Sequence, residues 1–340
     1  MPIYRLLILL FAVFTLAGCG RDDAAKDGVK PELVVYSERN EQLIGPLLDE
    51  YSENAGVEIK LVTAKAGALL ERLKAEGEQT PADVLLTVDA GNLWLAAENG
   101  LLRKLESDTL NSNIPKHLRD PEGRWYGLSV RARTIVHHPE RAPAADLSTY
   151  AALAKPALKG RLCLRTSKKV YNQSLVAMMI SQLGEAQTQQ IVEGWVANLA
   201  APPFANDTAV MEAILAGQCD VGIVNSYYFG RLQKDNPDLP LALFWPDQDK
   251  LGVHVNISGG AVIKASDSTK QAQALLEWLS AGEAQAQFAA SNMEYPANPA
   301  VDASPAVAKW GDFKANQINV AEAGRLQADA VKLMDQAGYK

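Results

Sequence analysis

The chain has 340 residues, which is more than a single hydrophobic core usually holds, so we expect two lobes or domains. Hydrophobic residues make up 48% of the chain and charged residues 21%, a composition typical of a soluble globular protein. The formal net charge is -7 at pH 7 and no basic stripe is present, which argues against a nucleic-acid partner.

The first 18 residues have the pattern of a bacterial export signal. Arg5 precedes an apolar run over 6–16, which is too short to span a bilayer as a stable anchor. The run ends in Leu-Ala-Gly-Cys, which resembles a lipoprotein cleavage box with Cys19 as the lipidated first mature residue; a plain signal peptide is the alternative. We therefore predict a signal peptide at 1–18, a flexible tether at 19–31, and a periplasmic protein anchored to a membrane by lipid.

The first third of the mature chain alternates strands and helices. We expect strands at 32–36, 57–62 and 83–88, each followed by a helix, and these helices are predicted at 41–54, 68–76 and 90–99. Such a βαβαβα pattern is typical of a parallel sheet with helices on its faces.

The rest of the chain predicts a second α/β lobe and two extended crossings. We expect the crossings at 125–136 and 253–258, and further strands at 161–165, 221–224 and 241–245. The expected helices are 147–158, 175–183, 187–198, 209–216, 269–280, 282–290 and 320–337. The prediction is an α/β clamshell that closes by a hinge motion, with lobe 1 at 32–130 and 258–310, lobe 2 at 131–257 and a C-terminal helix segment at 311–340.

Two cysteines remain once Cys19 is set aside. Cys163 and Cys219 each lie on a segment that leads to a strand end and then to tyrosines. In an oxidising compartment an even pair favours a disulfide that would join two neighbouring strands. Two buried free thiols are the alternative.

Tyrosines follow two strands of the predicted second lobe. Tyr171 comes after 161–165, and Tyr227 and Tyr228 come after 221–224, in the first turn of a predicted helix. Arg131 and Arg133 lie on the first crossing. Because ligands of open α/β sheets bind beyond the carboxyl ends of strands, we expect these side chains to meet in the cleft.

The chemistry of three phenols restricts what they can bind. Ionising one phenol at pH 7 costs about 4 kcal/mol, so three phenolates would form only around a strongly charged cation. Phenolate oxygens are hard donors suited to a small trivalent metal ion. A metal repels arginine, so a guanidinium there would hold an anion. Half-buried aromatics with hydroxyls bonded to the backbone are the alternative.

The chain resembles the periplasmic ferric-ion-binding proteins of bacterial iron ABC importers, within the extracellular solute-binding proteins. The stretches that carry the resemblance are VVYSER (34–39), WYGLSVRAR (125–133), VYNQS (170–174), NSYY (225–228), NISGG (256–260) and EYPANP (294–299). The resemblance implies the clamshell fold of a type II periplasmic binding protein, and it implies that the protein is a monomer. It further implies that the protein binds Fe3+ together with a synergistic anion such as carbonate or bicarbonate. It also implies delivery to an inner-membrane ABC permease.

The resemblance assigns roles to individual residues. Tyr171, Tyr227 and Tyr228 match the metal ligands of the family, and Arg131 or the neighbouring Arg133 matches its anion-binding arginine.

The chain departs from the family just after the first strand. Several members have a further histidine or tyrosine ligand where this chain has Asn40 and Glu41. We expect Asn40 to orient an anion or water. Glu41 is a possible metal ligand but is also typical of a helix start. Tyr36 is a weaker candidate ligand.

The sequence also bears on two other classes of function. No nucleophile elbow, zinc helix motif or Ser-His-Asp arrangement is present, so we expect no enzymatic activity. The alternative within the same fold is a small organic solute, such as a polyamine, thiamine or a phosphonate, instead of ferric ion.

Overall fold

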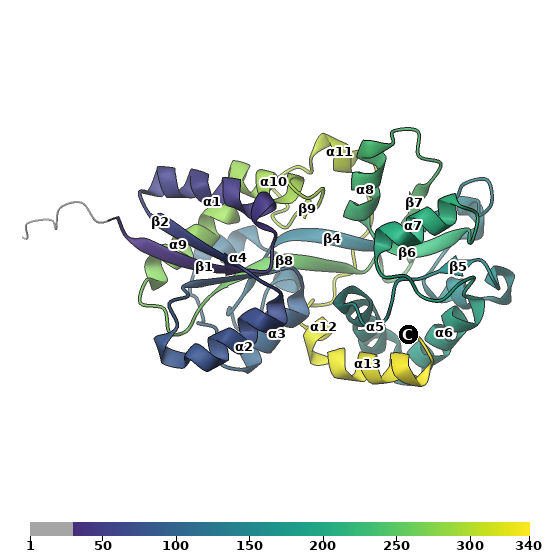
Figure 1. The fold of residues 1–340 in the computed structure, drawn as a ribbon, viewed down its shortest axis with the longest axis horizontal. Coiled ribbons are helices and arrows are strands. Elements are labelled where there is room, and N and C mark those ends of the chain that lie inside the picture. The colour runs from purple at the N-terminus through teal and green to yellow at the C-terminus, as the bar shows by residue number, and fades with distance from the viewer. Residues whose placement is uncertain (1–29) are drawn as a thin grey trace, which may run out of the picture. The chain divides into compact units, whose positions relative to one another are not determined.

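The computed structural model describes residues 30–340, and residues 31–340 form one compact unit. The predicted signal peptide, most of the tether and Cys19 lie outside the described residues. Within residues 30–340, no helix combines the length and the apolar character needed to cross a membrane. The unit consists of two α/β lobes, and the long strands β4 (Tyr126–His137) and β8 (Val255–Val262) run side by side between them (Figure 1).

Lobe 1 is built on three strands that run in the same direction. Its elements are β1 (Glu32–Ser37), α1 (Glu41–Ala55), β2 (Glu58–Thr63), α2 (Ala66–Glu76), β3 (Val84–Thr87), α3 (Ala90–Glu98), α4 (Asp108–Asn113), α9 (Thr269–Leu279), α10 (Gly282–Ala290) and β9 (Tyr295–Pro296). The short helix α11 (Pro305–Ala308) follows and leads to Trp310, which packs against Phe229 in the other lobe. β1 pairs in parallel with β2 and β3, as the alternating pattern predicts. β8 then pairs with β3 in the antiparallel direction.

Lobe 2 continues the same sheet on the other side of the crossing. Its elements are β5 (Leu162–Cys163), α5 (Val170–Leu183), α6 (Glu185–Asn198), α7 (Asp207–Leu215), β6 (Val221–Asn225), α8 (Ser226–Asp235), β7 (Ala242–Phe244), α12 (Glu322–Arg325) and α13 (Gln327–Gln336). The strand order is β2-β1-β3-β8-β4-β6-β5, and β7 and β9 also pair with β4. Because β4 pairs with β8 in one part and with β6 in the next, this one strand positions residues of both lobes.

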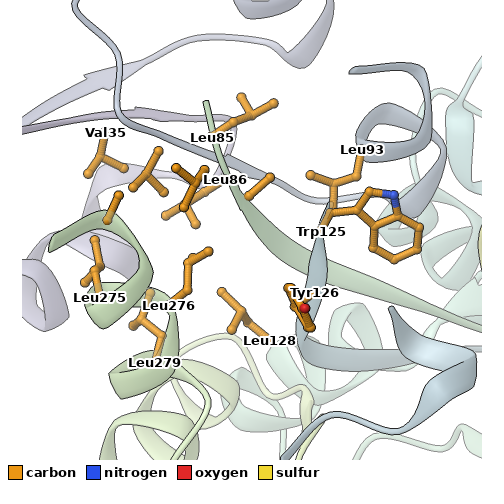
Figure 2. Packing of buried hydrophobic residues seen from close by; sticks show 14 of the residues in the cluster. Val35, Leu85, Leu86, Leu93, Trp125, Tyr126, Leu128, Leu275, Leu276 and Leu279 are labelled. Atoms are coloured by element: carbon orange, nitrogen blue, oxygen red, sulfur yellow. The ribbon is translucent and has the colours of Figure 1, made fainter. Parts of the chain in front are cut away.

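A buried hydrophobic cluster holds the sheet of lobe 1 against its helices (Figure 2). It includes residues of β1, β3, α3, β4 and α9, among them Val35, Leu85, Leu86, Leu93, Trp125, Tyr126, Leu128, Leu275, Leu276 and Leu279. Each such leucine contributes about 1.5–3 kcal/mol by leaving water. The cluster therefore holds β1 and β3 in place, and their carboxyl ends lead to α1 and α3.

The C-terminal helix differs from its prediction. A continuous helix at 320–337 was expected, but α12 and α13 are separate and meet at Leu326. Gly324 of α12 lies so close to α3 that a Cβ there would be 2.6 Å from the Trp94 side chain. The chain turns at Leu326. As a result, α12 contacts both α3 and α5, whereas α13 packs on α5 and buries Leu333.

Two other predicted helices were placed wrongly. The predicted helix at 147–158 consists of two short 3-10 turns, Ala151–Ala154 and Pro156–Leu158, because Pro156 has no N–H to continue a helix. The helix expected to begin at residue 175 begins at Val170. Tyr171 therefore lies in the first turn of α5 and not in a loop before it.

The predicted pairing of the two remaining cysteines is confirmed in the structure. A disulfide joins Cys163 on β5 to Cys219, just before β6, and the two strands are parallel neighbours. The bond closes a segment with a sequence separation of 56 residues, which includes α5, α6 and α7. It therefore restrains the segment that carries Tyr171 and the pairing of β5 with β6, the strand that leads to Tyr227 and Tyr228.

Candidate metal centre

A cavity of about 1110 Å³ opens between the two lobes and contains most of the predicted site residues. Lobe 2 contributes the three tyrosines, and lobe 1 contributes polar residues from the end of β1 and the start of α1. Arg131 of the crossing strand β4 also lines it. The structure thus brings together Tyr171, Tyr227, Tyr228, Arg131, Asn40 and Glu41.

The three phenols come from the first turns of two helices. Tyr171 belongs to α5, and Tyr227 and Tyr228 belong to α8. Tyr171 and Tyr227 are buried and Tyr228 is partly buried, and the rings of Tyr227 and Tyr228 lie 4.4 Å apart between centroids. Both helices begin at the edge of lobe 2 that faces lobe 1, so their first side chains reach the same cavity.

Burial keeps Tyr171 and Tyr227 protonated in the metal-free protein. Loss of hydration raises the pKa of Tyr171 to about 12, although the nearby Arg131 guanidinium opposes the increase. Burial also raises the pKa of Tyr227, and the neighbouring phenols Tyr171 and Tyr228 raise it further. A ligand that needs phenolates must therefore supply enough positive charge to displace these protons.

Four cationic side chains surround the phenols. The Arg131 guanidinium carbon lies 5.4 Å from the centre of the Tyr171 ring, and the Lys169 Nζ lies 4.7 Å from it. Arg165 lies between two tyrosines, 5.4 Å from the Tyr171 ring and 5.9 Å from the Tyr228 ring. Arg231 lies 5.3 Å from the Tyr227 ring. Three phenolates next to these cations would be favoured electrostatically, and an anion would be as well.

Arg131 and Arg133 have different surroundings, although they are two residues apart. Arg131 donates to Ser258 Oγ at 3.0 Å and to the carbonyl of Ile257 at 2.8 Å, while its Nε is buried without a partner among the described residues. It lines the cavity, and its guanidinium also lies 3.6 Å from Glu294 Oε1. Arg131 therefore has the features expected of an anion-binding arginine.

Arg133 does not line the cavity, so the structure gives no support to its predicted role with an anion. Its guanidinium donates to Asp207 Oδ2 and Asn225 Oδ1, each at 3.1 Å, and to Asn172 Oδ1 at 3.0 Å. Asn172 follows Tyr171, and Asn225 precedes the helix of Tyr227. Arg133 thus connects the starts of the two helices from behind and holds the tyrosines in place.

Three predicted residues of lobe 1 take different positions. Asn40 is the N-cap of α1, where its Oδ1 accepts from the N–H of Gln42 at 2.9 Å, and its side chain is exposed at the cavity. Glu41 is exposed in the first turn of α1 and lines the cavity. Tyr36 is buried away from it, and its hydroxyl donates to Glu76 at 3.0 Å. Tyr36 is therefore a structural residue of lobe 1.

Arg165, Lys169 and Arg231 were missed by the sequence reasoning. Arg231 could have been found, because it follows Tyr227 by four residues and so lies on the same face of α8. Lys169 could also have been found once the helix start at Val170 was known. Arg165 has no such signal, because a buried ion pair with Asp207 at 3.4 Å decides its direction.

The donor atoms of the cavity point to one kind of metal chemistry. Among residues 30–340, no group of three or more histidine, cysteine, aspartate or glutamate side chains could hold a metal ion. Three phenols line the cavity. Their hard oxygens suit a trivalent ion better than soft or divalent metals.

Comparison with known proteins identifies the family. The model of the family described as bacterial extracellular solute-binding protein matches residues 47–315. This chain belongs to that family. This solute-binding protein is 41% identical over 314 residues to Iron uptake protein A2 of Synechocystis, covering 90% of this chain and 89% of that protein. Iron uptake protein A1 of the same organism is 37% identical over 353 residues and covers 99% of this chain and 98% of its own length.

A solved structure supports the same relationship. The Trichodesmium protein IdiA (FutA), in complex with iron and citrate ligands, matches this solute-binding protein with a TM-score of 0.88 and 41% identity. The match covers 91% of this chain and 100% of that chain. The two-lobed clamshell and the resemblance to iron-binding solute-binding proteins are thereby confirmed.

Proposed function

We propose that this protein is the substrate-binding component of a bacterial ABC importer and captures ferric ion together with a synergistic anion. The single observation that carries the proposal is the convergence of three phenols, Tyr171, Tyr227 and Tyr228, on one cavity between the lobes. The protein binds and delivers its cargo without transforming it.

The charges of the site fit this cargo. One ferric ion is balanced by three phenolates from lobe 2. The anion that completes the coordination shell then needs positive charge from the protein, which Arg131, Lys169 and Arg231 supply at the cavity wall. A polyamine or thiamine would instead need acidic walls, and a phosphonate would leave the buried phenols without a partner. The ferric ion with bicarbonate or citrate is therefore the cargo that uses both the phenols and the cationic side chains of the cavity.

The route of the cargo follows from export of the chain. The protein acts as a monomer in the periplasm, attached to a membrane through acyl chains on Cys19, and it passes ferric ion to an inner-membrane permease. Cys19→Ala should release the protein as a soluble form in cell fractionation. If that variant stays in the membrane fraction, the protein is held there by something other than lipid on Cys19.

The proposal is tested by the visible spectrum of the purified protein. Adding ferric salt with bicarbonate or citrate should produce a reddish tyrosinate-to-iron charge-transfer band that saturates at one iron per protein. If saturating ferric ion gives no visible band, the phenols do not coordinate iron and the proposed function is wrong.

A further inference from the structure

Asp89 is a buried carboxylate that the proposed function does not use. It has no exposed surface and forms the N-cap of α3, where its Oδ1 accepts from the N–H of Gly91 at 2.8 Å. Capping needs only that one oxygen. Its Oδ2 accepts two further hydrogen bonds, from Ser174 Oγ at 3.0 Å and from Asn256 Nδ2 at 2.8 Å.

These two donors come from outside the α3 segment. Ser174 belongs to α5 in lobe 2 and is itself buried. It follows Tyr171 by three residues, so both side chains project from the same side of the helix. Asn256 lies on the crossing strand β8, directly opposite Arg131 on β4. Through its Oδ2 atom, Asp89 of lobe 1 therefore contacts α5, the helix that carries Tyr171, and β8, the strand that pairs with β4 at Arg131.

The electrostatics of Asp89 support a role beyond capping. Burial raises the pKa of its carboxyl to about 6, and the charge of Arg131 acts in the opposite direction. Glu38, the other charged group that acts on it, raises the pKa slightly further. A carboxylate without exposed surface is costly to keep unless several donors satisfy it, and such groups are concentrated at functional sites.

We infer that Asp89 is a positioning residue that joins the two lobes through Ser174 and thereby holds Tyr171 in place for metal binding. This inference rests on the proposed function, because it assigns Tyr171 to the metal. The link is short, buried and charge-assisted, so it restrains α5 relative to lobe 1 more strongly than a surface contact could. Loss of the link should let the first turn of α5 move and should speed the escape of bound iron.

The chain offers a matched control on the same helix. Ser181 of α5 also donates its hydroxyl to a carboxylate outside the helix, Glu322 Oε2 at 2.8 Å. Ser174→Ala and Ser181→Ala thus remove the same atom and the same kind of hydrogen bond, two helical turns apart. Ser174→Thr keeps the hydroxyl and serves as the rescue variant.

The first measurement is the loss of iron to a chelator. Each protein is loaded with ferric ion and citrate, excess EDTA is added, and the decay of the visible band is recorded. Ser174→Ala should lose iron about tenfold faster than the wild type, whereas Ser181→Ala and Ser174→Thr should stay within about twofold of it. Equal rates for Ser174→Ala and the wild type, or for the two alanine variants, would overturn the inference.

A second measurement does not depend on iron. In the metal-free proteins, amide hydrogen exchange in the first two turns of α5 should be about tenfold faster in Ser174→Ala than in Ser181→Ala. If the wild type gives no charge-transfer band, the proposed function fails, and this exchange experiment still decides whether Ser174 and Asp89 restrain the helix. Identical exchange in the two variants would show that they do not.

Discussion

The two faces of the cleft are built in different ways. On the lobe 2 face, the phenols stand at the starts of α5 and α8, and a buried network behind them links those starts through Arg133 and Asp207. On the lobe 1 face, Asn40 and Glu41 are exposed side chains at the start of α1. The difference teaches that the phenols of lobe 2 are held by buried contacts, whereas the lobe 1 side of the cavity is an exposed polar surface.

A buried network in lobe 2 holds the starts of the two tyrosine-bearing helices in place. Asp207 accepts from Arg133 at 3.1 Å and from the N–H of Asn225 at 2.9 Å, and it has no exposed surface. Arg165 also contacts it, at 3.4 Å. The disulfide between Cys163 and Cys219 restrains the neighbouring strands β5 and β6. Metal affinity should therefore depend strongly on the phenols of lobe 2 and weakly on the exposed side chains at the start of α1.

The largest effect is expected when a phenol oxygen is removed from the lobe 2 face. Residues that merely support a metal ligand already change affinity by about 10–100-fold, so Tyr171→Phe or Tyr228→Phe should weaken ferric binding by more than about 100-fold. The fold should persist, because one oxygen is lost and the ring remains. Competition titration with a ferric chelator measures the affinity, and an unchanged circular dichroism spectrum verifies the fold.

An intermediate effect is expected at the crossing between the faces. Arg131→Ala should lower iron affinity about tenfold or more when bicarbonate or citrate is present, because a charge-assisted hydrogen bond to the anion is lost. Without an added anion the variant and the wild type should differ little. Isothermal titrations with and without the anion test this, and an anion-independent loss would mean that the strand geometry is damaged instead.

The smallest effects are expected on the lobe 1 face. Tyr36→Phe should change iron affinity by less than about threefold, because its hydroxyl contacts Glu76 and not the cavity. Glu41→Gln should also have a small effect, below about fivefold, since an exposed acid in the first helical turn contributes mainly through the helix dipole. If either substitution lowered iron affinity as much as Tyr228→Phe does, lobe 1 would supply a metal ligand, and the proposed difference between the two faces would be wrong.

Part of this site could be predicted from the sequence because it depends on local signals. The tyrosines follow recognisable strands, and the carboxyl ends of strands meet at one edge, so their convergence in the cleft follows from topology. The alternation of strands and helices likewise predicts the parallel sheet of lobe 1.

The remaining features depend on contacts between distant segments. Arg131 and Arg133 share one face of a strand by periodicity, yet β4 changes partner between them, from β8 to β6. The buried Asp207 then decides where Arg133 points. No local sequence pattern predicts the change of pairing partner along β4 or the direction of the Arg133 side chain. The same is true of Asp89, whose partner Ser174 is 85 residues away in the chain.

The most direct test of phenolate coordination is an acid titration of the iron-loaded protein. Because burial raises the pKa of Tyr171 to about 12 in the metal-free protein, each phenol must lose a proton to bind iron and regain it on release. Iron affinity should therefore fall as the pH falls, with more than one proton taken up for each iron released. The visible band and the far-UV circular dichroism are followed together from neutral to acid pH. Our account predicts that the band bleaches in mild acid while the fold is intact; iron occupancy that stays constant until the protein unfolds would contradict it.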